Sequence, residues 1–176
     1  MAEIKIVFTG PVGAGKTAAI GAISEIPVVS TEAHASDDVA KQKKTTTVAM
    51  DYGEISLNEK QVVKLYGTPG QERFSYMWEI LITGAMGLII LIDCRRENPQ
   101  ADLAMYMENF LPFIDNYSIV VGLTHSENKR EIPLQMTEYS DEQGLHLPIF
   151  PVDARNPQDV KILIESLVSM LQTAVE

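Results

Sequence analysis

The first quarter of the chain contains the pattern that most restricts its fold. Residues 10–17 read Gly-Pro-Val-Gly-Ala-Gly-Lys-Thr, which satisfies G-x-x-x-x-G-K-[ST]. The apolar run Ile4–Phe8 precedes this pattern, and a helical segment over Lys16–Glu25 overlaps its end. This order of strand, loop and helix predicts a phosphate-binding loop, in which glycines let several backbone N–H groups face one anion. Lys16 is then expected to reach the β- and γ-phosphates, and Thr17 to bind Mg²⁺.

The rest of the chain alternates short apolar runs with helical segments, which predicts a largely parallel α/β sheet. Residues 27–46 carry little periodicity and are expected to form a long loop, and Gln71–Thr83 a mobile or helical stretch. The other expected elements are a β-hairpin of Thr47–Leu57 and Gln61–Tyr66, strands at Met86–Asp93, Ser118–Leu123 and Leu147–Val152, and helices at Asn98–Asp115, Pro133–Gln143 and Pro157–Ala174. We therefore expect one domain over residues 1–176, with six strands and about five helices.

Composition argues against two classes of partner. The chain has 14 lysines and arginines against 24 aspartates and glutamates, a net charge of −10, whereas nucleic acids and anionic membranes attract basic proteins. Residue 2 is not glycine, no cysteine stands at the C-terminus, and the longest apolar stretch, Ala85–Ile92, is too short to span a bilayer. Cys94 is the only cysteine, which excludes an internal disulfide and fits a reducing compartment. We expect a cytoplasmic protein with no direct membrane anchor.

A second motif follows the expected hairpin directly. Residues 67–74 read Gly-Thr-Pro-Gly-Gln-Glu-Arg-Phe. Together with the first motif, this resembles the Ras-like small GTPases, whose second phosphate-sensing segment reads D-x-x-G-Q-E. The resemblance covers nearly the whole chain and implies a three-layer P-loop NTPase G domain that binds GTP, GDP and Mg²⁺. It also implies that the Gly70 N–H contacts the γ-phosphate, while Gln71 orients the attacking water and acts with Lys16 in catalysis. The alternative is that Gln71 is an ordinary polar turn residue.

The second motif departs from the family at its first position. Gly67 stands where the family has an aspartate that helps to hold Mg²⁺, and glycine has no side chain to offer. Metal binding would then rest on Thr17, a second threonine, the phosphates and water. The chain looks most like bacterial Ras-like GTPases of the gliding-motility polarity type, which share this departure. Such relatives work with regulatory or effector proteins, and the resemblance implies a partner of the roadblock type.

The second threonine is expected near the end of the long loop. Residues 45–52 read Thr-Thr-Thr-Val-Ala-Met-Asp-Tyr, where Rab-like proteins have T-I-G-V-D-F. Aligned in this way, Thr47 is the threonine that closes over Mg²⁺ and the γ-phosphate, and Thr46 remains an alternative. A Thr-rich entry into a strand is the simpler explanation, since β-branched residues favour strands.

Two further segments stand where the family recognises the base. Thr124-His125-Ser126-Glu127 replaces N/T-K-x-D, so that His125 could cover the base face and Glu127 could accept hydrogen bonds from guanine. Asp153-Ala154-Arg155 replaces S-A-K, and the Ala154 N–H would face guanine O6. The alternative is a pair of ordinary loops with relaxed or lost base choice. The residues that the resemblance assigns to the nucleotide are Gly13, Ala14, Gly15, Lys16, Thr17, Ala18, Thr47, Gly70, Thr124, His125, Glu127, Asp153, Ala154 and Arg155.

The function expected from these motifs is a GTP-binding switch that hydrolyses GTP slowly, because no arginine finger is evident. A nucleotide-binding scaffold without hydrolysis is one alternative, and a P-loop kinase or ATPase is another. Kinases of that kind usually carry an arginine-bearing lid, and no arginine-rich run is present. Phe74, Tyr76 and Trp78 are expected either in the core or on a nucleotide-dependent binding face. Arg95 and Arg96 are expected to decorate a loop rather than to supply a catalytic arginine.

Overall fold

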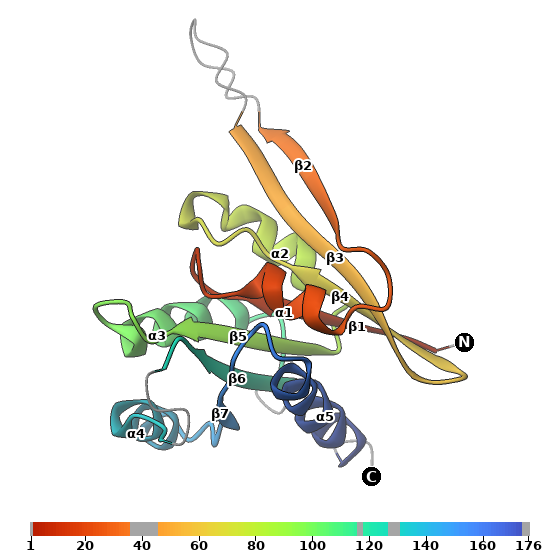
Figure 1. Cartoon of the computed structure of the whole chain (residues 1–176). Helices are drawn as coiled ribbons and strands as arrows, with labels where there is room; N and C mark the ends of the chain where they lie inside the picture. The colour runs from red at the N-terminus through yellow and green to blue at the C-terminus, as the bar shows by residue number, and fades with distance from the viewer. Residues whose placement is uncertain (1, 36–45, 116–117, 127–130, 174–176) are drawn as a thin grey trace, which may run out of the picture.

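A seven-stranded sheet lies at the centre of the computed structural model, which describes residues 2–35, 46–115, 118–126 and 131–173 (Figure 1). The elements in chain order are β1 (Ala2–Thr9), α1 (Lys16–Ile23), β2 (Val29–Ala35), β3 (Thr46–Asn58), β4 (Gln61–Gly67), the 3₁₀ helix η1 (Glu72–Phe74), α2 (Tyr76–Ile82), β5 (Gly87–Asp93), α3 (Pro99–Phe110), β6 (Ile119–Thr124), α4 (Leu134–Glu142), β7 (Ile149–Pro151) and α5 (Pro157–Thr173). The α/β class and the five α-helices agree with the sequence, whereas the single domain over 1–176 stays a prediction.

The sheet order brings the ends of several distant strands together. The strands are arranged β2-β3-β4-β1-β5-β6-β7, and β1 runs parallel to both β4 and β5. The series continues in parallel from β5 to β6 and to β7, while β3 is antiparallel to β2 and β4. Carboxyl ends of parallel strands meet at one edge of a sheet, and ligands bind in α/β folds at that edge. The loops after β1, β5 and β6 therefore share one side of the molecule.

The prediction of six strands and of a loop over residues 27–46 is wrong in part. Residues 29–35 form β2, which pairs with β3 so that Val29 lies opposite Tyr52. The sequence of β2 shows no regular apolar alternation, so its periodicity does not reveal a strand. Backbone pairing with β3 at the edge of the sheet creates this strand, and such pairing is a tertiary contact. Residues 36–45 lie outside the described residues.

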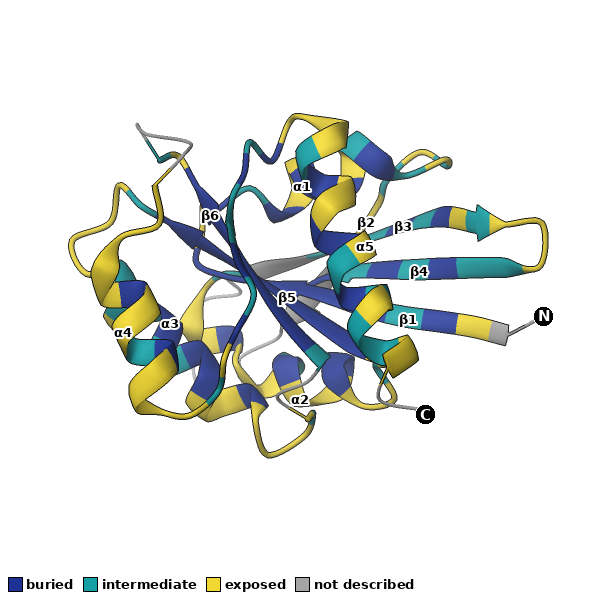
Figure 2. Cartoon of the chain, turned by 90° about the horizontal axis from the view of Figure 1, so that it is seen from below, coloured by how far each residue is buried: buried dark blue, intermediate teal, exposed yellow. Residues whose placement is uncertain are grey.

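Helices cover both faces of the sheet and create two cores. On one face α1 and α5 pack together, and Ile20, Leu163 and Leu167 lie in their shared cluster. On the other face α2, α3 and α4 pack around Trp78 and Phe110. Between these layers all residues of β5 and β6 are buried, as the dark strands in Figure 2 show. These buried strands are the rigid support for the loops at their ends.

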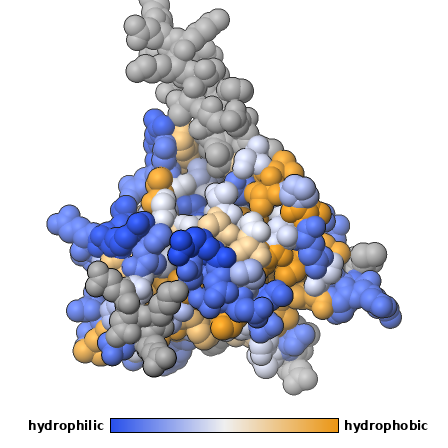
Figure 3. Space-filling model, in the orientation of Figure 1, coloured by the Kyte–Doolittle hydropathy of each residue, from blue (hydrophilic) through white to orange (hydrophobic). Residues whose placement is uncertain are grey.

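No helix among the described residues is long and apolar enough to cross a membrane. Hydrophilic side chains cover much of the face shown in Figure 3, with hydrophobic areas between them. The largest exposed fractions among the bulky apolar side chains are 67% at both Ile80 and Leu134.

Candidate functional site

The loop between β1 and α1 needs glycine at three positions. Gly10, Gly13 and Gly15 have φ angles of 145°, 81° and 102°, which side chains disfavour. A Cβ atom on Gly10 would lie 2.1 Å from the Leu91 carbonyl oxygen, and one on Gly15 would lie 2.7 Å from Cβ of Ala154. The loop therefore curls tightly onto β5 and onto the loop before α5, and α1 begins immediately afterwards at Lys16. This is the backbone geometry of an anion cradle at a helix N-terminus.

Lys16 lies inside this curl. Only 8% of the residue is exposed, and its ammonium donates hydrogen bonds to the carbonyl oxygens of Gly10 at 2.7 Å and Pro11 at 2.8 Å. Burial lowers the pKa of Lys16 to about 8, and the nearby Asp51 carboxylate partly opposes this shift. The Lys16 ammonium is thus a buried cation enclosed by the backbone of the loop. A polyphosphate is the kind of ligand that would relieve its desolvation.

Gly70 lies directly against the phosphate loop. A Cβ atom there would be 2.7 Å from the backbone nitrogen of Val12 and 2.8 Å from Nζ of Lys16. Just before it, the hydroxyls of Thr68 and Thr9 are 2.8 Å apart in the interior. The segment after β4 is therefore in contact with the place where the end of a phosphate chain is expected.

Thr17 makes a contact that no motif indicated. Its hydroxyl donates a hydrogen bond to Oδ2 of Asp51, a buried residue of β3. The other oxygen of the same carboxylate accepts a hydrogen bond from the Ser30 hydroxyl at 2.7 Å. The predicted metal-binding hydroxyl is thereby connected to the β2–β3 hairpin.

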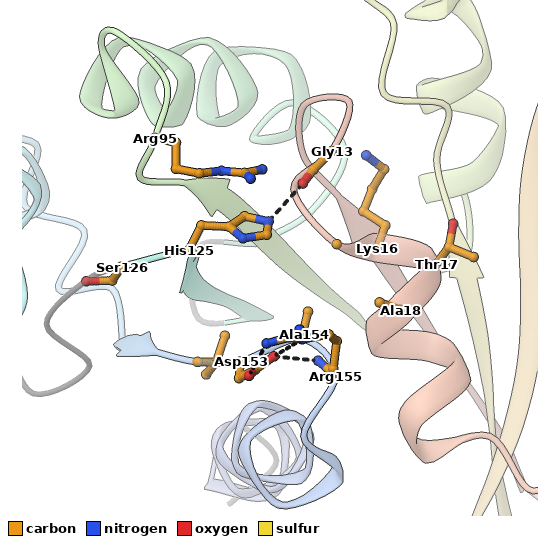
Figure 4. A pocket seen from close by; sticks show the side chains of 12 residues that line it. Gly13, Lys16, Thr17, Ala18, Arg95, His125, Ser126, Asp153, Ala154 and Arg155 are labelled. Atoms are coloured by element: carbon orange, nitrogen blue, oxygen red, sulfur yellow. Dashed lines mark hydrogen bonds and ion pairs between the residues drawn. The ribbon is translucent and has the colours of Figure 1, made fainter.

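A pocket of about 620 Å³ opens beside the phosphate loop (Figure 4). This volume lies within the usual range for small-molecule sites. Nine of the predicted residues line it: Gly13, Gly15, Lys16, Thr17, Ala18, His125, Asp153, Ala154 and Arg155. The pocket is also lined by Arg95, Ser126 and Val152, which sequence reasoning did not assign to the site. The cationic Lys16, Arg95 and Arg155 around it suit an anionic ligand.

The segment after β6 is hydrogen-bonded to the phosphate loop. Thr124 is buried, and its hydroxyl donates a hydrogen bond to the Ala14 carbonyl oxygen at 2.8 Å. Nε2 of the exposed His125 lies 3.1 Å from the Gly13 carbonyl oxygen, with a backbone φ of 53°. His125 thus contacts the loop itself, where the sequence suggested a cover for a base. Glu127 lies outside the described residues.

The segment before α5 forms the opposite wall. Asp153 and Arg155 form a two-pronged ion pair, with Nε and Nη2 of the arginine each 3.0 Å from a carboxylate oxygen. Ala154, between them, is buried against Gly15. Figure 4 shows this pair across the pocket from His125 and Arg95. The two predicted base segments therefore do face one cavity.

Arg95 is not merely a loop decoration. Its guanidinium is held by Asp93 through contacts of 3.0 Å and 2.8 Å, and it lines the pocket. Burial raises the pKa of Asp93, but hydrogen bonds from Arg95 outweigh this effect and hold it below its usual value. The sequence did contain a signal for Arg95 as a pocket residue, namely the spacing Asp-x-Arg at the end of a buried parallel strand. The carboxyl ends of such strands form the edge of the sheet where ligands bind.

Gln71 and Thr47 belong to the two other segments that the sequence assigned to the phosphate end of the site. Gln71 is exposed, and its Oε1 accepts a hydrogen bond from Nε of Arg73 at 2.7 Å. Thr47 lies in β3, opposite His34 in the strand register, and its side chain is outside what the structure describes. Neither position tests the assigned role.

The aromatic residues after Gln71 divide between the two expected environments. Phe74 and Trp78 are buried, and the Trp78 indole donates to the Pro69 carbonyl oxygen at 2.9 Å. Tyr76 is 56% exposed. The core alternative therefore holds for Phe74 and Trp78 but not for Tyr76.

One family model and several known proteins are similar to this chain. A family model described as "Conserved hypothetical ATP binding protein" matches residues 26–173. An uncharacterized protein of Methanocaldococcus jannaschii is 25% identical over 122 residues, 69% of this chain and 68% of that protein. The Ras-related protein RABE1e of Arabidopsis thaliana is 25% identical over 172 residues, 93% of this chain and 72% of that protein.

Among solved structures, the G domain of the FeoB iron transporter of T. maritima matches with a TM-score of 0.65 and 16% identity. The match covers 96% of this chain and 99% of that one. The three-layer G-domain fold of P-loop NTPases is thus confirmed. The family model and the likeness to a Ras-related protein also support nucleotide binding in general.

Proposed function

This chain belongs to the family described as conserved hypothetical ATP binding proteins, and we propose that it is a guanine-nucleotide switch that hydrolyses GTP slowly. The contact of Gly70 with Val12 and the Lys16 ammonium carries the proposal. A γ-phosphate held by Lys16 would meet the backbone of Gly70 directly. Binding or loss of the γ-phosphate would then move the segment that leads into η1 and α2, as in switch proteins whose loops become ordered around a phosphate.

The choice of base is the first part to test. Guanine is supported by the pocket wall of His125 on one side and Asp153, Ala154 and Arg155 on the other, at the positions of the two base segments of Ras-like proteins. The family description favours adenine. Equilibrium titration with GDP, GTP, ADP and ATP decides between them. We expect guanine nucleotides to bind at least tenfold more tightly, and tighter binding of ATP would make the chain an ATPase or kinase instead.

The position of Gln71 supports the proposal that GTP hydrolysis is slow. Its amide oxygen accepts a hydrogen bond from Arg73, so the side chain must leave this partner to orient a water. Single-turnover GTP hydrolysis should fall in Gln71→Ala and rise modestly in Arg73→Ala, which frees the amide. Equal and negligible rates in wild type and Gln71→Ala would favour the scaffold without hydrolysis, which the missing carboxylate at Gly67 also suggests.

Magnesium fits the oxygen donors at the phosphate end of the site. Thr17 and Thr47 are the residues that would hold it, and the ion would neutralise charge on the phosphates. The described residues contain no group of three or more His, Cys, Asp or Glu side chains that could bind a metal by themselves. A metal here would therefore depend on the nucleotide, which suits a hard cation that keeps phosphate and water ligands.

We also propose that a regulatory protein reads the α2 side of the molecule. Tyr76 and Ile80 are exposed on α2, which follows Gly70 by a few residues. Like the bacterial gliding-motility polarity GTPases, the chain lacks an aspartate at position 67. This likeness supports a cytoplasmic partner protein of the roadblock type. A purified protein of that type should bind the chain loaded with a GTP analogue at least tenfold more tightly than the GDP form. Tyr76→Ala should weaken this binding, and equal affinity for both forms would contradict the proposal.

A further inference from the structure

Other side chains lie close to the Cα atom of Gly67. Gly67 and Asp51 lie opposite each other in the pairing of β4 with β3. A Cβ atom on Gly67 would lie 3.1 Å from Cδ1 of Ile20, 3.2 Å from Cβ of Asp51 and 3.4 Å from Oδ2 of Asp51. The side chains of Asp51 and Ile20 therefore border the space that a side chain at residue 67 would enter, and Asp51 is the one that brings a carboxylate to it.

The carboxylate of Asp51 is held in a defined orientation. The residue is 8% exposed, and its two oxygens accept hydrogen bonds from the hydroxyls of Thr17 and Ser30. The same charge acts on the Lys16 ammonium, whose pKa it raises against the effect of burial. A buried carboxylate is costly unless it is paired or coordinates a metal, and among the interactions described here its hydrogen-bond partners are two neutral hydroxyls.

The hydrogen bond from Thr17 also prepares this residue as a ligand. A hydroxyl has one proton to donate and two lone pairs to offer. Because Thr17 gives its proton to Asp51, its lone pairs are free to face a cation. Mg²⁺ prefers oxygen ligands and usually takes one or two carboxylates together with phosphate oxygens. Thr17 and Asp51 together provide a hydroxyl and a carboxylate beside the phosphate loop.

We propose that Asp51 supplies the carboxylate of the magnesium site, from the strand next to the one that carries it in Ras-like proteins. This inference rests on the proposed nucleotide-binding function. It explains how the chain can lack an acidic residue at position 67 and keep a magnesium-dependent nucleotide site. Ser30 holds the second oxygen of the carboxylate, so the site also includes the β2–β3 hairpin.

The magnesium dependence of nucleotide release tests this assignment. The protein is loaded with a fluorescent GDP analogue, and its dissociation is followed at free Mg²⁺ concentrations buffered from nearly zero upward. In wild type, Mg²⁺ should slow dissociation with a saturating midpoint. In Asp51→Asn that midpoint should move to Mg²⁺ concentrations at least about 10- to 100-fold higher, which is the cost typical of losing a group that only supports a metal ligand. Dissociation in chelator should change little.

Glu54→Gln is the matched control, because it removes one negative charge from the same strand, where Glu54 accepts a hydrogen bond from Tyr52 away from Thr17. Its midpoint should equal that of wild type. An unchanged midpoint in Asp51→Asn overturns the assignment, as does a wild-type protein that binds GDP with no magnesium dependence. If the wild type binds ADP but not GDP, the proposed function fails, and the same titration with an ADP analogue still tests Asp51.

An exchange variant covers the case in which Asp51→Asn does not fold. Asp51→Gly with Gly67→Asp returns one carboxylate to the same space from β4, and removes the two Asp51 atoms closest to the new Cβ. This variant should regain a midpoint within about tenfold of wild type, whereas Asp51→Gly alone should not. An exchange variant that binds GDP in chelator without any magnesium dependence overturns the proposal.

Discussion

The two ends of the pocket are built in different ways. At the phosphate end, a Cβ atom on Gly10 or on Gly70 would collide with backbone atoms, and Lys16 is buried. At the other end, polar side chains close the pocket, among them the exposed His125 and Arg155, the latter in an ion pair with the half-buried Asp153. Backbone sterics therefore determine the first region, and solvated side-chain contacts determine the second. Substitutions should cost most at the phosphate end and least at the opposite wall.

Gly10→Ala should have the largest effect. Its Cβ would lie 2.1 Å from the Leu91 carbonyl oxygen at a φ of 145°, so backbone must move. We expect a loss of about 3–5 kcal/mol in the free energy of unfolding, measured by chemical denaturation. Gly13→Ala is the control, because its Cβ would meet no atom within 4 Å and only the φ of 81° is strained. It should lose about 1–2 kcal/mol, and equal losses would contradict the steric account.

Lys16 should make the stability of the nucleotide-free protein depend on pH. Burial lowers its pKa from 10.5 to about 8 in the folded protein, so between these values the unfolded chain binds more protons. Stability should therefore rise with pH across this window, by about 3 kcal/mol from this group. The difference between wild type and Lys16→Met in denaturation at pH 7 and at pH 10 isolates the contribution. If the difference in the free energy of unfolding between wild type and Lys16→Met is the same at both pH values, the Lys16 ammonium is solvated in the folded protein, which would contradict the prediction.

Thr124→Val should have an intermediate effect, because Thr124 joins the two regions. Valine keeps the shape of the side chain but removes the donor to the Ala14 carbonyl oxygen. We expect a loss of about 1–2 kcal/mol in the free energy of unfolding, together with weaker nucleotide binding. Thr124→Ser retains the hydroxyl and should be closer to wild type. If serine is as damaging as valine, packing of the Thr124 methyl group matters as much as its hydrogen bond, which would contradict a role carried by the hydroxyl alone.

His125→Asn should have the smallest effect. It removes the imidazole contact with the Gly13 carbonyl oxygen, and asparagine tolerates the positive φ. A single exposed hydrogen bond of this kind predicts nucleotide binding about 3- to 10-fold weaker by equilibrium titration. His146→Asn is the control, since His146 also has a positive φ and does not line the pocket. A loss well above tenfold would make His125 a direct ligand of the nucleotide.

Much of the fold followed from patterns within single segments. The glycine spacing over residues 10–17 identified the phosphate loop because its backbone angles exclude side chains at those glycine positions. The apolar run before Asp93 identified a strand buried on both faces, and β5 is such a strand. β2 escaped detection because pairing with β3, and not a pattern of its own, makes it a strand.

The sequence alone determined the phosphate loop, the helix that begins at Lys16 and the buried central strands, because local backbone angles and apolar runs require them. Only the tertiary structure decided that Asp51 meets Thr17, that His125 meets Gly13 and that Arg95 lines the pocket. These contacts join residues from different loops, helices and strands around the pocket. The order and register of the strands set the distances between these residues. Neither can be predicted from the sequence of a single segment, because both depend on pairing between segments.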